Sequence, residues 1–236
     1  GDGNTASVAN PTHIYTSSGD FTVRLTLTDA NGCQQTLENP AMVRIYTSPN
    51  AALSTDQNNG CAPLPVAFTD ASSATGVNIV NYQWNFGNGN TFNFPNATQT
   101  YTQSGNYDVS LVVTDARGCL DTMVQSITVN QGPVAAFTAD ILSGCAPHPV
   151  QFLSQAGGGT AVVNWNWNFG DGNSATGTLV NHVYQVNGMY DVTLAVSDAN
   201  GCTDTLTQAQ YINIGDPDIA MNVSAIQACP GTILSF

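Results

Sequence analysis

The 236-residue chain has no lysine, and its only cationic side chains apart from histidine are Arg24, Arg44 and Arg117. Charged residues make up 8% of the sequence, against roughly 25% in a typical soluble protein. The formal net charge is −13, because 16 acidic residues oppose those three arginines. A chain so poor in cations cannot neutralise a phosphate backbone or an anionic bilayer, so we expect neither nucleic acid nor anionic lipid as a partner.

Long apolar runs and helical patterns are also missing. No run approaches the ~20 residues of a membrane-spanning helix, so we expect no membrane insertion in this stretch. The first residues carry no basic-then-apolar signal peptide. No apolar stripe persists at the 3.6-residue helical period, and β-branched residues with Gly and Asn turns dominate, which predicts an all-β fold.

The chain does contain an internal repeat with a period close to 84 residues. Residues of one type recur at this interval in three sets: Pro49, Pro133 and Pro217; Cys61, Cys145 and Cys229; Phe68, Phe152 and Phe236. Such self-similarity signals an array of like units. We expect the later part of one repeat at 1–47, complete repeats at 48–131 and 132–215, and the first part of a further repeat at 216–236.

An aromatic strand and the turn that ends it are the most distinctive stretch of each complete repeat. Residues 165–172 read W-N-W-N-F-G-D-G, and residues 84–89 read W-N-F-G-N-G. Side chains in a strand point alternately to opposite faces, so Val163 and the aromatic residues share one face and the asparagines the other. The predicted core residues are Trp84, Phe86, Trp165, Trp167 and Phe169.

A second alternating strand follows the turn and leads into a hairpin. Near the start of the chain, the pattern places Phe21, Val23, Leu25 and Leu27 inward, and Asn31-Gly32 marks the hairpin tip. About seven short strands per repeat, with a tryptophan in a central strand, predict an Ig-like sandwich.

Three strings give the chain a family resemblance. They are W-N-F-G-D-G at 167–172, H-V-Y-x-x-x-G-x-Y at 182–190 and V-T-L-A-V-S-D-A-N-G at 192–201. They resemble the PKD (polycystic kidney disease) repeat. The resemblance implies tandem Ig-like (PKD-type) β-sandwich domains arranged head to tail in an extracellular protein. With G-C-A-P and N-G-C added, the chain is similar to PKD arrays of Bacteroidota-type, gliding adhesin-like surface proteins.

Six cysteines recur at two repeat positions without a Cys-x-x-Cys pair, which favours disulfides and an oxidising compartment. In an Ig topology the two positions lie at opposite ends of a repeat, too far apart for one bond. We therefore predict a bridge between repeats, from Cys61 to Cys202. The remaining cysteines, Cys33, Cys119, Cys145 and Cys229, would pair outside this stretch. Sequence spacing alone equally allows Cys61 with Cys119 and Cys145 with Cys202.

Aspartates at loop tips raise the hypothesis of calcium binding, since carboxylate oxygens suit this ion. The candidates are Asp2, Asp29, Asp115, Asp171 and Asp198. Asn88 takes the turn position of Asp171 in the second repeat, and turn aspartates commonly accept local backbone N–H groups. We therefore predict no metal site and no cofactor.

The histidines do not form a catalytic pattern. His13 and His182 share one repeat position, where the second repeat has Gln99, and His148 occupies the position of Leu64. No Ser or Cys nucleophile has a fixed partner, so we do not expect an enzyme.

Two threonines are hypothetical O-glycosylation sites. Thr122 and Thr205 lie at one repeat position in Asp-Thr-apolar triplets, which resemble acceptor sites of Bacteroidota. The alternative is an ordinary polar strand start. Asn96 and Asn222 match the N-glycosylation sequon by pattern alone.

The repeats favour a structural role: a stiff, disulfide-supported spacer in a cell-surface filament or adhesin stalk, whose partners are neighbouring repeats. The alternative is a PKD-type module that binds glycans or proteins beside a secreted enzyme or adhesin. Phe92 and Phe94 are the candidate exposed aromatic pair, with Ser174 and Thr176 expected at the matching places of the third repeat. Both hypotheses predict an extracellular location, and the first predicts the cell surface.

Overall fold

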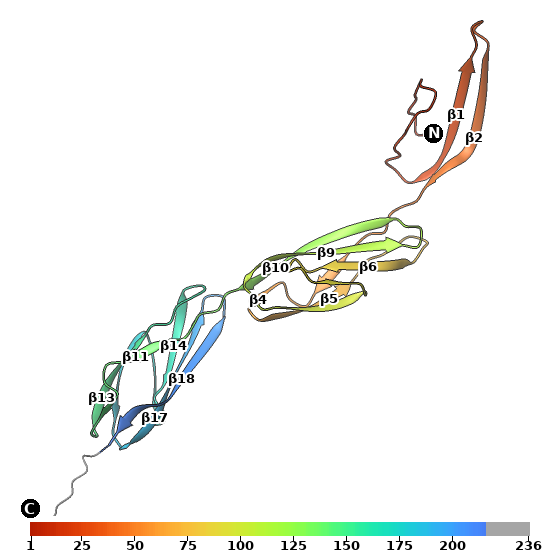
Figure 1. Ribbon diagram of the computed structural model, residues 1–236. Helices are drawn as coiled ribbons and strands as arrows, with labels where there is room; N and C mark the ends of the chain where they lie inside the picture. The colour runs from red at the N-terminus through yellow and green to blue at the C-terminus, as the bar shows by residue number, and fades with distance from the viewer. Residues whose placement is uncertain (216–236) are drawn as a thin grey trace, which may run out of the picture. The chain divides into compact units, whose positions relative to one another are not determined.

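A computed structural model describes residues 1–215, and every regular element in that range is a β-strand (Figure 1). This result confirms the all-β class. The chain divides into two compact units, residues 1–59 with 63–129 and residues 60–62 with the chain from Asn130 onward. The short segment 60–62 thus belongs to the later unit, although the residues on either side of it belong to the earlier one.

The earlier unit begins with an isolated hairpin. Strands β1 (Gly19–Thr28) and β2 (Gln34–Ile45) pair antiparallel and form a two-stranded sheet of their own (Figure 1). Leu25 and Leu27, predicted to point inward, are 54% and 63% exposed. The prediction of burial fails here because no second layer of the described chain covers this sheet.

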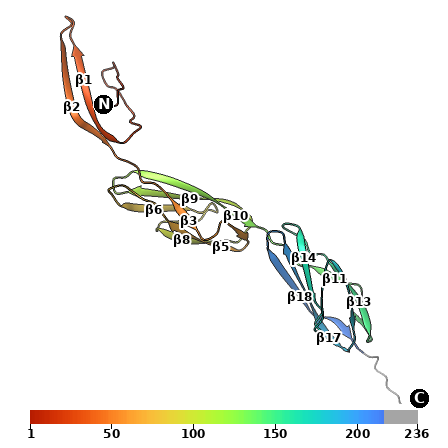
Figure 2. The same ribbon diagram turned by 180° about the vertical axis from the view of Figure 1, so that it is seen from behind.

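The second repeat forms a two-layered sandwich. Its strands are β3 (Leu53–Thr55), β4 (Asn59–Cys61), β5 (Leu64–Asp70), β6 (Ile79–Asn85), β7 (Thr91–Phe92), β8 (Asn96–Tyr101), β9 (Gly105–Asp115) and β10 (Leu120–Asn130). One sheet has the order β3-β5-β8 and the other β4-β10-β9-β6-β7. Figure 2 shows the two sheets from behind. These layers confirm the Ig-like sandwich.

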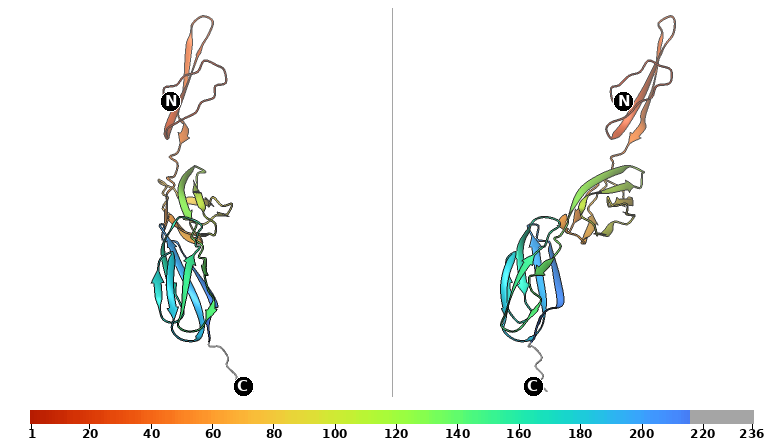
Figure 3. Two further views of the ribbon diagram at one scale, coloured as in Figure 1. Left: turned by 90° about the vertical axis from the view of Figure 1, so that its left-hand side faces the viewer. Right: turned by 60° about the vertical axis from the view of Figure 1, so that its left-hand side comes forward.

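The third repeat builds the same sandwich again. Its strands are β11 (Phe137–Ala139), β12 (Ser143–Gly144), β13 (His148–Ser154), β14 (Val162–Asn168), β15 (Ser174–Thr176), β16 (Leu179–Tyr184), β17 (Gly188–Asp198) and β18 (Thr203–Ile214). The sheet orders, β11-β13-β16 and β12-β18-β17-β14-β15, match those of the second repeat. Figure 3 shows this repeat, in cyan to blue, from two further directions.

The aromatic strand supplies the centre of each core. Trp84 and Trp167 are 0% and 2% exposed, and Phe86 and Phe169 are equally buried. Each indole Nε1–H donates to a backbone carbonyl, so burial leaves no polar atom of the tryptophan unpaired. These two tryptophans and two phenylalanines occupy the buried face expected from the alternation.

The alternation breaks at the start of the same strand. A register shift between Val162 and Asn164, a β-bulge, puts Val162 against the core and leaves Val163 49% exposed. Trp165 lies beyond the bulge and packs against the core on the same face as Trp167, but it is only partly buried. A bulge adds one residue to a strand and re-aims the side chains beside it, which strict alternation cannot represent.

Two tyrosines in each complete repeat stabilise the corner after the turn. Tyr101 and Tyr184 donate their buried hydroxyls to the carbonyl oxygens of Phe86 and Phe169. Burial raises the pKa of Tyr101 to about 12, so this hydroxyl stays protonated and donates throughout the physiological range. The second tyrosine of the third repeat, Tyr190, donates to the Val186 carbonyl, which is the tyrosine corner of Ig-like folds.

Candidate functional site

The Gly-Asp-Gly turn is closed by a histidine from the neighbouring strand. Oδ2 of Asp171 lies 2.7 Å from Nε2 of His182, and its other oxygen accepts the Asn173 backbone N–H. The imidazole also stacks on the Phe169 ring, with centroids 4.2 Å apart. Burial acts to raise the pKa of Asp171, but hydrogen bonds from Asn173 and His182 outweigh it, so the pKa lies below its ordinary value.

The first repeat has the same pair. His13 Nε2 lies 2.6 Å from Asp2 Oδ2, and Asn4 donates its backbone N–H to that aspartate. The hydrogen bond from His13 is the main cause that lowers the pKa of Asp2 far below its ordinary value. His13 and His182, which share one repeat position, thus each bind the aspartate of a turn.

The second repeat replaces both partners. Asn88 stands at the turn and Gln99 stands at the histidine position. Gln99 Oε1 instead accepts a hydrogen bond from Asn90 Nδ2 at 3.2 Å. A surface hollow of about 290 Å³ opens there, lined by Asn88, Asn90, Gln99, Gln103 and Tyr107 among others. Every residue that lines this hollow is uncharged.

The hairpin aspartates bind their own backbone. Asp115 and Asp198 are 1% and 3% exposed. Oδ1 of Asp198 accepts the backbone N–H groups of Asn200 and Cys202, and Oδ1 of Asp115 accepts the equivalent pair. Within residues 1–215, no three His, Cys, Asp or Glu side chains gather where they could hold a metal ion.

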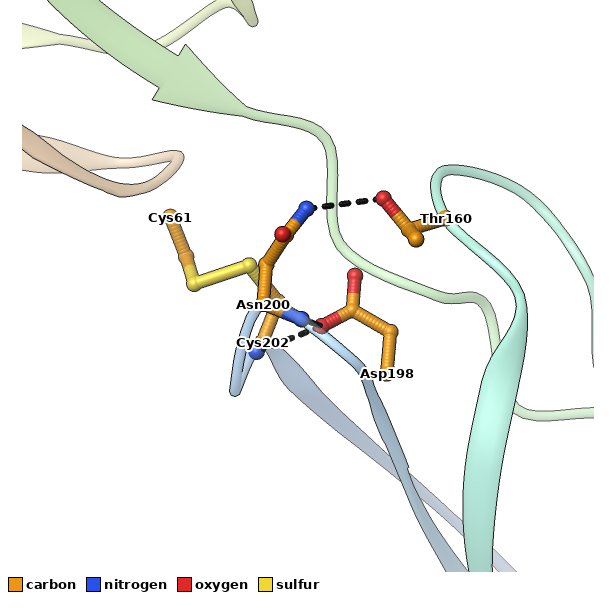
Figure 4. Close-up of a disulfide and its surroundings, with 5 residues drawn as sticks. All are labelled: Cys61, Thr160, Asp198, Asn200 and Cys202. Atoms are coloured by element: carbon orange, nitrogen blue, oxygen red, sulfur yellow. Dashed lines mark hydrogen bonds between the residues drawn. A yellow bond between two sulfur atoms is a disulfide. The ribbon is translucent and has the colours of Figure 1, made fainter.

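A disulfide joins Cys61 to Cys202, with Cα atoms 5.5 Å apart (Figure 4). Cys202 lies at a hairpin tip that is held by Asp198, and the adjacent Asn200 side chain donates to Thr160 Oγ1 at 2.8 Å. The alternative pairs, Cys61 with Cys119 and Cys145 with Cys202, are not formed, because Cys202 bonds to Cys61. Cys33, Cys119 and Cys145 form no disulfide within residues 1–215, so their pairing outside this stretch stays a prediction; Cys229 lies outside the described residues.

His148 is the third histidine and lies in β13. Its ring packs against Gly144, where an added Cβ would come within 2.2 Å of the imidazole. Its Nε2 is buried and has no hydrogen-bond partner among the described residues. The ring therefore fills space that a side chain at position 144 would otherwise occupy.

An exposed aromatic pair lies on the second repeat. Phe92 and Phe94 are 40% and 66% exposed, and their ring centroids lie 5.4 Å apart. Phe92 pairs with Trp84 across the strands, and Ala175 pairs with Trp167. Phe92 and Ala175 therefore occupy equivalent positions in the two repeats. Gly177 matches Phe94, because each supplies the carbonyl that accepts the indole N–H. The expected matches, Ser174 and Thr176, are therefore wrong by one residue.

A shallow groove of about 370 Å³ lies on the same sheet. Gln83, Asn85, Thr91, Asn93 and Ser110 line it with amides and hydroxyls, together with Val112 and Trp84. Phe92 pairs with the core-facing Trp84, whereas the neighbouring Thr91 lines the groove, so Phe92 and the groove lie on opposite faces of β7. Neutral amides and hydroxyls, which both donate and accept hydrogen bonds, suit uncharged polar ligands.

The two threonine candidates, Thr122 and Thr205, are exposed. The aspartate before each has a structural role: Asp121 accepts the Ala51 backbone N–H at 2.8 Å, and Asp204 accepts the Ala135 N–H at 2.7 Å. O-glycosylation stays a prediction, which the intact mass of protein from the native host tests. Of the sequon residues, Asn96 is exposed and Asn222 lies outside the described residues.

Sequence reasoning missed the Asp–His pair and the two surface depressions. Asp2 precedes His13 by the same eleven positions that separate Asp171 from His182, and both positions change together in the second repeat. That joint change was a signal of contact. The depressions left no comparable signal, since they depend on how turns and strands meet in space.

These features define tandem β-sandwich domains of the Ig-like class, with a repeated aromatic core and turn. A family model described as "PKD domain" matches residues 1–45, 46–129 and 130–214, so the chain belongs to the PKD domain family. In the part of the chain that the structure describes, no helix is long and apolar enough to cross a membrane.

Two curated relatives are proteases by name. Pre-pro-metalloprotease PrtV of Vibrio cholerae serotype O1 (strain M66-2) is 30% identical over 135 residues, or 57% of this chain and 15% of that protein. Collagenase ColA of Bacillus cereus is 35% identical over 65 residues, or 28% of this chain and 7% of that protein. The chain thus matches only a small part of each relative.

Two similar solved structures are single PKD domains. The PKD1 domain of Vibrio cholerae PrtV is 38% identical, with a TM-score of 0.32 over 35% of this chain and 98% of that one. The PKD1 domain of Vibrio anguillarum Epp is 29% identical, with a TM-score of 0.33 over 36% and 96%.

Proposed function

We propose that this chain is a non-catalytic binding module of an extracellular protein, and that the second repeat holds a glycan or a protein through the surface around Phe92 and Phe94. The exposed pair of phenylalanine rings carries the proposal. Exposing large apolar side chains to water on a monomer's surface is unfavourable in free energy, and a bound partner removes this exposure. The third repeat has Ala175 and Gly177 at these places, so neither ring is needed to build the fold.

The relatives support attachment to a secreted hydrolase. PrtV and ColA are named as a metalloprotease and a collagenase, and each contains a stretch similar to this chain. A module beside such an enzyme would hold it on its substrate and raise the local substrate concentration. The neutral groove suits hydroxyl-rich glycans or the polar backbone of an extended protein.

Binding to a glycan array and to collagen-coated surfaces tests the proposal. The double variant Phe92→Ala/Phe94→Ala should lose at least tenfold in affinity, because aromatic anchors carry most of the binding energy at such surfaces. Val80→Ala is the matched control, since Val80 is 62% exposed on the same sheet and lies away from the ring pair. Equal loss in both variants, or no loss in either, would reject this surface.

A second candidate is the shaft of a cell-surface filament or gliding-type adhesin. The Cys61–Cys202 bond favours it, because the two cysteines come from successive matches to the family model. A covalent link between repeats resists mechanical load. Force spectroscopy of the chain under oxidising and reducing conditions tests this candidate, and unchanged unfolding forces would reject it.

A further inference from the structure

We infer that the hollow at Asn88 and Gln99 is a second ligand site, which binds the ring of a neutral sugar. This site goes beyond the aromatic surface proposed above and uses neither Phe92 nor Phe94. The chain contains three copies of this turn, and the second differs from the other two.

In the third repeat this place is closed by the chain itself. His182 lies over Phe169 and reaches Asp171, and the His13–Asp2 pair repeats that bond. The imidazole thus fills the space between the turn and the following strand. In the second repeat the uncharged Asn88 and the flexible Gln99 do not bond to each other, and a hollow of about 290 Å³ is present.

Side-chain amides around the hollow have N–H groups that remain available to a ligand. One N–H of Gln99 donates to the Thr100 carbonyl, and one N–H of Asn90 donates to Gln99. Each amide group has two N–H donors, so one remains on each residue. The Asn88 oxygen accepts the Asn90 backbone N–H, while the side-chain amide of Gln103 has no hydrogen bond with any other described residue.

The hydrogen-bonding groups that line the hollow determine which class of ligand it can bind. Neutral amides both donate and accept hydrogen bonds, as sugar hydroxyls do, and they offer no charge to hold an anion or a cation. Tyr107 lines the hollow, and its hydroxyl, which donates to the Gln103 carbonyl, can still accept a hydrogen bond from a sugar hydroxyl. A net charge of −13 further disfavours acidic ligands.

The experiment is an NMR titration of the uniformly ¹⁵N-labelled chain with glucose, galactose, mannose and N-acetylglucosamine, each at millimolar concentrations. The side-chain amide signals of Asn88, Asn90, Gln99 and Gln103 should shift and saturate with at least one sugar. Asn173, which takes the place of Asn90 in the third repeat, is the internal control and should not shift.

The double variant Asn88→Asp/Gln99→His tests the location, because it installs the pair that two other repeats already use. It should fold, fill the hollow and weaken sugar binding at least tenfold. Gln103→Leu changes an exposed side chain outside the turn and should also weaken binding at least tenfold, so the test stands even if the double variant misfolds.

The inference would be overturned if the side-chain amide signals still shifted with sugar in the substituted chains. It would also be overturned if none of the four sugars shifted them in the parent chain. Shifts at the four amides with a collagen-like peptide but with no sugar would also overturn it. The Phe92→Ala/Phe94→Ala variant should bind the sugar normally, and this separates failure of the hollow from failure of the aromatic surface.

Discussion

His182 Nε2 lies 2.7 Å from Asp171 Oδ2, while its ring stacks on Phe169 with centroids 4.2 Å apart. One side chain therefore closes the turn and covers the edge of the aromatic core. The same bond in the first repeat, and its joint replacement in the second, make this pair the main chemical difference among the turns.

The Asp171–His182 pair predicts a specific response to acid. The pKa of Asp171 is lowered from its ordinary value of 3.8, so its contribution to stability is complete above that value. The contribution is lost as the pH falls through the lower folded value. Asp171→Asn removes this titration, so the free energy of unfolding should fall less steeply below about pH 4 than in the parent chain.

Urea unfolding at a series of pH values, followed by tryptophan fluorescence, measures this difference. Asp140→Asn is a control, because the Asp140 carboxylate accepts one backbone N–H from Gln151 and has no histidine partner. If the free energy of unfolding changed with pH in the same way for the parent and Asp171→Asn, the assignment of this titration to Asp171 would be contradicted.

Two glycines of the third-repeat turn should differ sharply in their tolerance of a side chain. Gly170 and Gly172 both have positive φ angles, 82° and 88°. A Cβ at Gly170 would come within 2.4 Å of the Asp191 carbonyl oxygen, whereas a Cβ at Gly172 meets nothing within 4 Å. Gly172→Ala should cost about 1–2 kcal/mol from backbone strain alone, and Gly170→Ala should cost more. Chemical denaturation of both variants checks the order, and equal losses would contradict it.

The two tryptophans of β14 should also differ. Trp167 is 2% exposed and packs against Phe137 and Phe152, so Trp167→Ala should cost about 3–5 kcal/mol. Trp165 is only partly buried, and its replacement by alanine should cost less than half as much. Equilibrium unfolding in urea measures both values. A larger loss for Trp165→Ala than for Trp167→Ala would contradict the burial of the two rings.

The Cys61–Cys202 bond should stabilise the unit that contains Cys202. Cys202→Ala should lower its free energy of unfolding by about 2–4 kcal/mol under oxidising conditions. Cys145→Ala, at a position that is an exposed thiol, should have little effect. Thermal unfolding with and without reductant measures the loss. Non-reducing peptide mapping checks the connectivity, and a peptide joining Cys61 to Cys119 would contradict it.

The pattern of residues predicted the core better than the surface. Trp84 and Trp167 could be placed in the core because alternation and repetition agree, and burial of a large aromatic ring leaves few alternatives. Val163 could not be placed, because the bulge between Val162 and Asn164 depends on pairing with β17. Leu25 shows the same limit, since its pattern fits a buried strand while its burial requires a covering sheet.

The sequence by itself determined the all-β class, the repeat, the turns and most of the aromatic core. Each of these follows from local spacing, because side-chain direction and turn geometry are properties of a few consecutive residues. Only the tertiary structure decided that Asp171 meets His182, that Cys61 meets Cys202, and that Asn88 and Gln99 leave a hollow between them. These relationships join residues distant in the chain, and such distances are set by how strands pack.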